Sequence, residues 1–394
     1  MQLWQPALPD RYLTLEPDAL ERAIDARRAE LASDLLILGH HYQVDDVIRH
    51  ADLTGDSLKL SQMAAQRVGE QGAKYVVFCG VHFMAESADL LAPEGTSVIL
   101  PDLSAGCSMA DMADYEDALD AWDAITDALP DHVRVIPITY VNSTAAIKAF
   151  VGENGGACCT SSNAMRVFEW ALQGGTRPAE RGEEIKLLFL PDQHLGRNTA
   201  HAQGIDVDAH AALYDPRLAR QGEPLGGMTA QQLADARVIL WAGHCSVHKL
   251  FRPEHIDQIR AESPETTIIV HPECAKEVVD KADLWGSTEK ILRTIEDAPA
   301  GSKWAVGTEH NLVARLAREA KARGVDVRIL SDCQCMCTTM YRIDEPHLLW
   351  VLDNLASGKV VNRISVHPEA RGPALQALDR MLALSTNNTA HAGV

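Results

Sequence analysis

Nine short apolar runs, separated by helical stretches, dominate the hydrophobic pattern of this chain. They fall into three groups of three, so the chain reads as one unit written three times. The runs are 34–39, 74–79 and 97–100; 133–139, 185–190 and 237–241; and 266–270, 303–307 and 325–330. Continuous apolar runs of this length are typical of parallel strands buried on both faces. We therefore predict an α/β fold of three similar α/β/α sandwich domains with right-handed crossovers.

The same pattern predicts the domain bounds. A chain of 394 residues is too long for one core and fits two or three domains. Helical spacing from Glu21 to Leu31 precedes the first strand. The expected parts are a helical lead-in over 1–30, domain 1 over 31–130, domain 2 over 131–262, domain 3 over 263–375 and a C-terminal tail over 376–394.

A cysteine follows the third strand of each unit: Cys107, Cys245 and Cys337. In parallel sheets, active residues collect beyond the carboxyl ends of the strands. Three thiolates are one short of the four that complete an iron–sulfur cluster, so one iron would stay open for chemistry. The repeat therefore predicts a central metal site with one ligand from each unit.

The third unit offers more than one cysteine for this role. Cys333, Cys335 and Cys337 form a C-x-C-x-C run, which does not match the C-x-x-C of common zinc modules. Structural zinc needs four ligands at ordinary spacings, and the sequence has no C-x-x-C, so we favour the cluster. Cys337 is the expected ligand and Cys335 the alternative, and the roles of Cys333 and Cys335 stay open.

Polar side chains with acid, base or hydrogen-bonding groups follow the first strand of each unit. They are His40 and Tyr42, then Tyr140 and Asn142, and finally His271 and Glu273. A single histidine or tyrosine at such a place is more often structural. Their repetition at three strand ends favours a common site.

A hydroxyl residue then stands near a predicted helix start in each unit: Ser57, Ser161 and Thr288. The interval from Tyr42 to Ser57 equals that from Glu273 to Thr288. One such residue is usually an N-cap. Three at matched positions favour binding of a phosphate or carboxylate, because helix N-termini offer free N–H groups and a positive dipole end.

The net charge and the composition limit the classes of molecule that the protein is expected to bind. The formal net charge of −19 argues against nucleic acid, because phosphate binding needs a basic surface. No apolar stretch is long enough to span a membrane, and the first residues lack the pattern of a signal peptide. The acidic charge is best explained by solubility, although a local site could still bind small anionic substrates. We expect a cytoplasmic protein without disulfides.

These residues lie in motifs that resemble the quinolinate synthetase A family. The matching stretches run in family order over most of the chain. They are GHHYQ (39–43), GDSLKLSQ (55–62), FCGVHFMAE (78–86), AGCSMA (105–110), TYVNSTA (139–145), TSSNA (160–164), FLPDQHLGRNTA (189–200), GHCSVH (243–248), VHPEC (270–274), GST (286–288) and CMCTTM (335–340). The sequence departs from the family at its last cysteines, which some members carry as C-x-x-C-x-x-C.

The resemblance implies three α/β/α domains about a pseudo-threefold axis, with a central [4Fe–4S] cluster held by Cys107, Cys245 and Cys337. It implies condensation of iminoaspartate with dihydroxyacetone phosphate to quinolinate, phosphate and water in NAD biosynthesis, with the open iron as Lewis acid. It also implies a functional link to L-aspartate oxidase and to iron–sulfur assembly proteins.

Residue roles follow from the same resemblance. His40 and a mobile Tyr42 would handle substrate and proton transfer, and Tyr140 with Asn142 would hold the intermediate. His271 and Glu273 would act beside the cluster, with Glu273 as general base. The anionic groups would be bound by Ser57, Ser161 and Thr288. Two rival interpretations are an iron–sulfur dehydratase acting on a hydroxy acid and a non-enzymatic iron or oxygen sensor.

Overall fold

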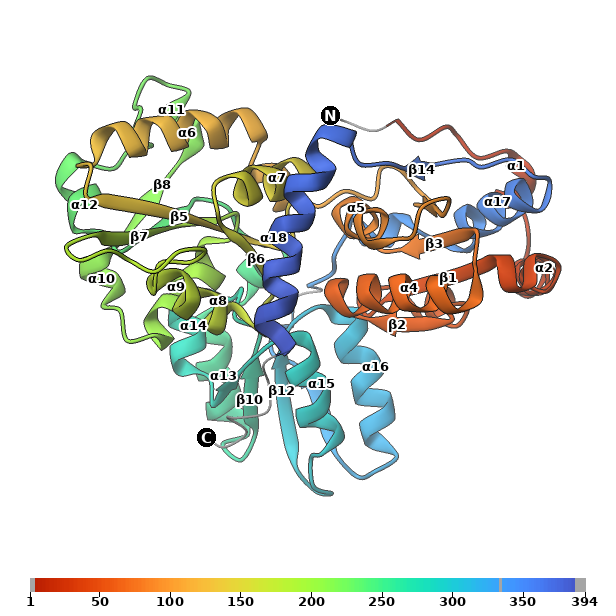
Figure 1. Ribbon diagram of the computed structural model, residues 1–394. Helices are drawn as coiled ribbons and strands as arrows, with labels where there is room; N and C mark the ends of the chain where they lie inside the picture. The colour runs from red at the N-terminus through yellow and green to blue at the C-terminus, as the bar shows by residue number, and fades with distance from the viewer. Residues whose placement is uncertain (1–3, 333–334, 387–394) are drawn as a thin grey trace. The chain divides into compact units, whose positions relative to one another are not determined.

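The computed structural model describes residues 4–332 and 335–386 (Figure 1). Within these residues, the strands form three largely parallel sheets connected through helices. The chain folds into two compact units. The first comprises Met1–Cys107, Glu309–Arg315 and Gln334–His367, and the second comprises Ser108–Thr308, Leu316–Cys333 and Pro368–Val394.

The first unit contains a five-stranded sheet with the order β14-β4-β3-β1-β2. Its strands are β1 (Leu35–His40), β2 (Leu53–Gly55), β3 (Tyr75–Cys79), β4 (Ser97–Ile99) and β14 (Arg363–Ile364). All pairs are parallel except β14 with β4, which is antiparallel. Every residue of β1 is buried, as expected of a central parallel strand covered on both faces.

Helices of the first unit connect and flank this sheet. They are α1 (Asp10–Leu13), α2 (Pro17–Leu31), α3 (Asp45–Ile48), α4 (Ser57–Gln71), α5 (His82–Leu91) and α17 (Glu345–Ala356), with short 3-10 turns at η1 (Ala32–Asp34) and η4 (Met340–Arg342). The N-terminal helices are fixed to α17 through Asp353, which accepts hydrogen bonds from Tyr12 Oη (2.8 Å) and Arg27 Nε (2.6 Å). The described part of the helical lead-in predicted for residues 1–30 is therefore packed within the first unit.

The second unit contains two sheets. The first has the order β6-β5-β7-β9-β8 and consists of β5 (Val133–Tyr140), β6 (Ala157–Cys159), β7 (Glu184–Leu190), β8 (Ala211–Tyr214) and β9 (Val238–Trp241). Its helices are α6 (Tyr115–Ala128), α7 (Ala145–Glu153), α8 (Ala164–Leu172), α9 (Gln193–Ala202), α10 (Val207–His210), α11 (Pro216–Ala219) and α12 (Ala230–Asp235), and the 3-10 turns are η2 (Ala110–Met112) and η3 (His248–Leu250).

The other sheet of the second unit has the order β11-β10-β12-β13. Its strands are β10 (Thr267–Val270), β11 (Leu284–Trp285), β12 (Lys303–Gly307) and β13 (Asp326–Ile329). The accompanying helices are α13 (Pro253–Glu262), α14 (Lys276–Lys281), α15 (Thr288–Glu296) and α16 (His310–Lys321). The first turns of α16 belong to the first unit, and the helix continues into the second.

The predicted α/β fold with parallel sheets is confirmed. All nine predicted strands are present, and their ends agree within one residue. The three sheets share one order, in which a short edge strand is followed by the first, second and third predicted strands. The short edge strands β2, β6 and β11 were not predicted, and neither were β8 and β14. The domain bounds stay a prediction.

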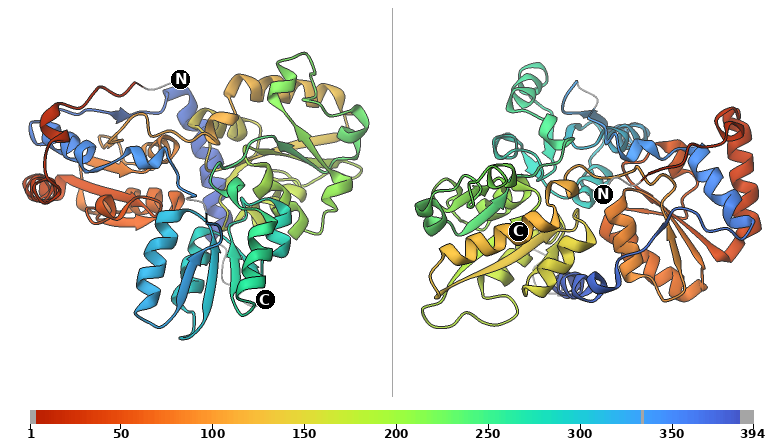
Figure 2. Two further views of the ribbon diagram at one scale, coloured as in Figure 1. Left: turned by 180° about the vertical axis from the view of Figure 1, so that it is seen from behind. Right: turned by 90° about the horizontal axis from the view of Figure 1, so that it is seen from above.

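The end of the described chain differs from the expected tail. Residues 376–386 belong to α18 (Pro368–Thr386), which lies along α7 (Figures 1 and 2). Its side chains Ala374, Ala377, Leu378 and Met381 are buried. The contact with α7 needs a glycine, because a Cβ on Gly152 would lie 1.9 Å from the carbonyl oxygen of Pro373. Residues 387–394 lie outside the described part.

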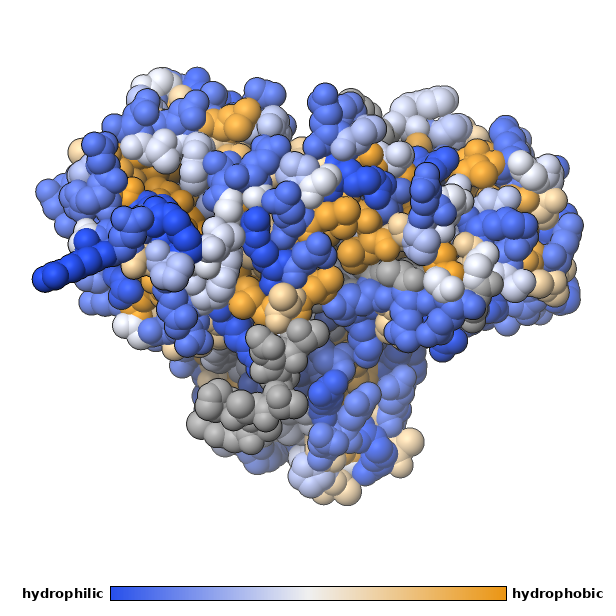
Figure 3. Space-filling model, viewed as in Figure 1, coloured by the Kyte–Doolittle hydropathy of each residue, from blue (hydrophilic) through white to orange (hydrophobic). Residues whose placement is uncertain are grey.

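The hydropathy of the surface agrees with the high content of charged residues in the sequence. The face drawn in Figure 3 is mostly hydrophilic, with several patches of apolar residues. Among the described helices, none combines the length and apolar character needed to cross a bilayer.

Candidate functional site

The structure places His40 and Tyr42 at the carboxyl end of β1, where parallel sheets carry their active residues. The two rings meet edge to face, with centroids 4.7 Å apart. The backbone N–H of Tyr42 donates to His40 Nδ1 at 3.2 Å. This bond makes Nδ1 an acceptor, so the neutral ring carries its proton on Nε2.

The loop that carries Tyr42 is fixed by the beginning of α16. Asn311 Nδ2 donates to the carbonyl oxygen of Tyr42 at 3.2 Å. The Arg315 guanidinium donates to the carbonyl oxygens of His41 (3.0 Å) and Gln43 (2.7 Å). These contacts hold the backbone on both sides of Tyr42, while its half-buried side chain extends from the loop. The mobility expected of Tyr42 stays a prediction.

Glu309 is a buried carboxyl group that sequence reasoning missed. It accepts hydrogen bonds from the backbone N–H groups of Leu312 (3.1 Å) and Cys337. Burial raises its pKa to about 7 in spite of these bonds. Glu309 follows β12, which is the second predicted strand of its unit. We looked for polar side chains only after the first strand of each unit, and the same search after the second strand would have found Glu309.

The described cysteines differ sharply in accessibility. Only the three expected ligands are half-buried, namely Cys107, Cys245 and Cys337. The others are buried: Cys79, Cys158, Cys159, Cys274 and Cys335. Burial raises the pKa of Cys79 and of Cys158 to about 12, which disfavours the thiolate form that binds metal. Cys333 lies outside the described residues.

Glu273 follows β10 and is 3% exposed. Its Oε2 lies 2.8 Å from His248 Nδ1, its Oε1 lies 3.8 Å from His271 Nδ1, and Tyr140 also forms a hydrogen bond to its carboxylate. Burial lowers the pKa of His271 to about 3, so this ring is neutral at pH 7. Burial alone would raise the pKa of Glu273, but the charges and hydrogen bonds of its neighbours hold it below the ordinary value.

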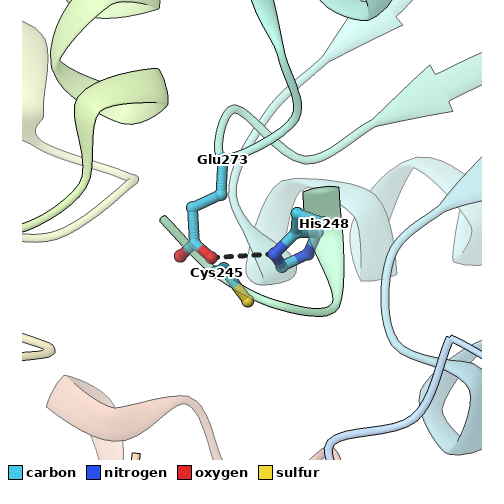
Figure 4. A group of neighbouring side chains, drawn as sticks. All are labelled: Cys245, His248 and Glu273. Carbon is cyan, nitrogen blue, oxygen red and sulfur yellow. Dashed lines mark hydrogen bonds and ion pairs between the residues drawn. The ribbon is translucent and has the colours of Figure 1, made fainter. Parts of the chain in front are cut away.

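His248 is a second residue that sequence reasoning missed. It lies on η3, three residues after Cys245 in the GHCSVH motif. Its Nε2 lies 3.1 Å from Thr308 Oγ1, and its ring stacks on His271 with centroids 4.5 Å apart. The motif was recognised for its cysteine, and the histidine was not assigned a role. Figure 4 shows its ring directed at Glu273, with Cys245 beside both.

Asp192 and Glu273 form a pair of buried carboxyl groups with opposite tendencies. Burial, followed by the charge of Glu273, raises the pKa of Asp192 well above its ordinary value. Asp192 nevertheless accepts backbone N–H bonds from His194 and Leu195 at the start of α9 (both 2.8 Å) and from Cys245 (3.2 Å). The pKa values of the two carboxyl groups are thus shifted in opposite directions.

The helix α9 connects two loops of this site. Asp192 at its N-terminus fixes the Cys245 backbone, as described above. Further along α9, Asn198 is 3% exposed and donates through Nδ2 to the carbonyl oxygens of Pro272 (2.8 Å) and Cys274 (2.9 Å). These two carbonyls flank Glu273, so Asn198 uses both of its amide donors to hold the segment that carries the carboxylate.

The other expected site residues lie at strand ends and helix starts. Tyr140 ends β5, and the half-buried Asn142 follows it. Ser57 and Thr288 are the first residues of α4 and α15. Ser161 lies in the turn before α8.

Neither Ser57 nor Thr288 caps its helix. The N-cap residues are Asp56 and Ser287, whose side chains accept from the backbone N–H groups of Lys59 and Lys290. The hydroxyls of Ser57 and Thr288 are therefore not required for capping.

Comparison with known proteins identifies the family of the chain. The family described as quinolinate synthetase A protein matches residues 22–383. A quinolinate synthase of Acidobacterium capsulatum is 52% identical over 375 residues, covering 95% of this chain and 95% of that protein. The quinolinate synthase of a Nocardioides species is 53% identical over 373 residues, covering 94% of this chain and 90% of that protein. That of Geobacillus thermodenitrificans is 50% identical over 378 residues, covering 96% of this chain and 97% of that protein. The chain therefore belongs to the quinolinate synthetase A family and is an enzyme.

Proposed function

We propose that this enzyme condenses iminoaspartate with dihydroxyacetone phosphate to give quinolinate, phosphate and water, as a step of NAD biosynthesis. The observation that carries the proposal is the selective accessibility of three cysteines at corresponding strand ends. The relatives named quinolinate synthase, which match nearly the whole chain, support the reaction.

In this proposal Cys107, Cys245 and Cys337 hold a [4Fe–4S] cluster. Their donor set fits, because the other described thiols are buried, Cys335 among them. Burial also disfavours the thiolate form of Cys79 and Cys158. A hydrogen bond from Thr339 also favours the Cys337 thiolate, although burial raises the pKa of that thiol. When bound, the cluster would supply a Lewis acid through its open iron.

Glu273 is the proposed general base. It is a buried carboxylate that keeps its charge, and the neutral His271 lies beside it. Tyr140 binds the carboxylate directly and orients it. Asn198 fixes the backbone on both sides of Glu273, so the base is held in place before substrate binds.

The anionic groups of the substrates are proposed to bind at helix starts. Ser57 and Thr288 open α4 and α15, and Ser161 precedes α8. Free N–H groups and the positive dipole end suit a phosphate or carboxylate there. Asn142 would hold the intermediate with Tyr140.

Proton transfer is the proposed role of the two residues after β1. His40 presents Nε2–H, because its Nδ1 is engaged by the backbone. Tyr42 packs on this ring and would shield it from water. The proposal further places the enzyme in the cytoplasm, with a functional link to L-aspartate oxidase and iron–sulfur assembly proteins.

The test is anaerobic reconstitution of the full chain, followed by an assay with both substrates. We expect quinolinate and phosphate to form in equal amounts. Glu273→Gln should abolish turnover while leaving the cluster absorbance intact. A fully loaded protein that makes no quinolinate would refute the proposal.

A further inference from the structure

Three buried or half-buried side chains of different chemistry converge at one point, and one of them is the proposed base. The Cys245 sulfur, a ring nitrogen of His248 and a carboxylate oxygen of Glu273 all lie within 4.8 Å of one another (Figure 4). Within residues 4–332 and 335–386, no other group of three such donors is this compact. Thiolate, imidazole and carboxylate are the donors that bind Zn²⁺ and related divalent ions at about 2.0–2.3 Å.

Each donor is held by a second group, as metal ligands usually are. Thr308 Oγ1 lies 3.1 Å from the distal nitrogen of His248, which leaves Nδ1 directed at Glu273. Asn198 fixes the Glu273 segment, and Asp192 binds the backbone N–H of Cys245 at 3.2 Å. The three donors are therefore placed before any ion arrives.

The donor set also suits a cation. Glu273 is a buried carboxyl group, and its neighbours are two histidines and Tyr140. A dication would balance the carboxylate and a Cys245 thiolate, whose proton would pass to the buffer.

We propose that the cluster-free enzyme binds one divalent transition-metal ion through Cys245, His248 and Glu273, with water as the fourth ligand. The ion replaces the hydrogen bond between His248 Nδ1 and Glu273 with two coordinate bonds, and the imidazole then carries its proton on Nε2, which donates to Thr308 Oγ1. Since it occupies Cys245, it blocks cluster loading. This last consequence rests on the proposed function, whereas the binding itself does not.

Cobalt(II) titration of the cluster-free full chain tests the site. We expect one equivalent to bind with the absorbance of tetrahedral cobalt and of a single sulfur-to-cobalt charge transfer. Cys245→Ser should remove the charge-transfer band. His248→Gln and Glu273→Gln should each weaken binding by more than about 100-fold, and Thr308→Val by about 10- to 100-fold. Zn²⁺ should displace the cobalt and slow later cluster reconstitution.

Matched controls separate this site from the three-cysteine one. Cys107→Ser and Cys337→Ser should bind cobalt like the parent chain, and so should Cys79→Ser at a buried thiol. Loss of binding in the first two, or absorbance of more than one thiolate, would place the ion on the cluster ligands and overturn the proposal. Unchanged affinity in both His248→Gln and Glu273→Gln would also overturn it. Circular dichroism confirms that each variant is folded.

Discussion

Replacing Asn198 with alanine tests how the catalytic carboxylate is held. In the structure the Asn198 amide donates at 2.8 and 2.9 Å to the two carbonyls that flank Glu273, and its side chain is buried. Without the amide, two buried carbonyls lose their donor, at about 1–3 kcal/mol each. The free energy of unfolding should therefore fall by about 2–5 kcal/mol.

The same change should affect turnover more than substrate binding. Once the Glu273 segment relaxes, a displacement of the base by about 1 Å lowers kcat about 100-fold. KM for both substrates should change little, and iron content should be retained, because Cys245 is fixed separately through Asp192. Denaturant unfolding and steady-state kinetics on the reconstituted enzyme measure both effects.

Asn354→Ala is the matched control for this variant. Its amide donates at 2.7 Å to the Trp350 carbonyl within its own helix, α17. We expect a loss of about 1 kcal/mol or less and unchanged kcat. If Asn198→Ala keeps the parent kcat and loses no more stability than Asn354→Ala, the argument for Asn198 as a positioning residue is wrong.

Three further predictions concern packing, pH and the loop after β1. Gly152→Ala should lower Tm strongly because its Cβ would meet the α18 backbone at 1.9 Å, whereas Gly69→Ala, with open space around it in α4, should raise stability by about 0.5–1 kcal/mol. The Arg134 hydrogen bond lowers the pKa of Glu183 to about 2, so the stability it contributes is present above the ordinary pKa of 4.5 and lost as the pH falls toward about 2. The Tm difference between the parent chain and Glu183→Gln should therefore close over that range, and a constant difference would contradict the assignment. Arg315→Ala removes the donor of two loop carbonyls and should raise KM several-fold at unchanged iron content. Steady-state kinetics measures this, and an unchanged KM would contradict the prediction.

The central strands were predictable because burial on both faces leaves a continuous apolar run. The edge strands β2, β6 and β11 were not, since each has only two or three residues. Of these, β2 (Leu53–Gly55) and β11 (Leu284–Trp285) are also partly exposed. Their pairing is set by the neighbouring strand rather than by their own sequence. The helix α18 was missed for a related reason, because it carries a proline inside its span and packs extensively on α7.

The candidate site was predictable where a residue follows a recognised strand, as His40 and Glu273 do. His248 and Asn198 were missed because they lie within a turn and a helix, and their importance depends on what they contact. His248 is identified by its bond to Glu273, and Asn198 by the two carbonyls it binds. Such contacts join segments far apart in the sequence and leave no periodic signal.

The central claim is that Cys107, Cys245 and Cys337 hold the cluster. The most direct measurement is the iron and sulfide content of anaerobically reconstituted Cys337→Ser and Cys335→Ser chains, compared with the parent. Because Cys337 is half-buried and Cys335 is buried, we predict that Cys337→Ser fails to hold a stable [4Fe–4S] cluster while Cys335→Ser loads fully. Full loading of Cys337→Ser together with loss of the cluster in Cys335→Ser would contradict the account.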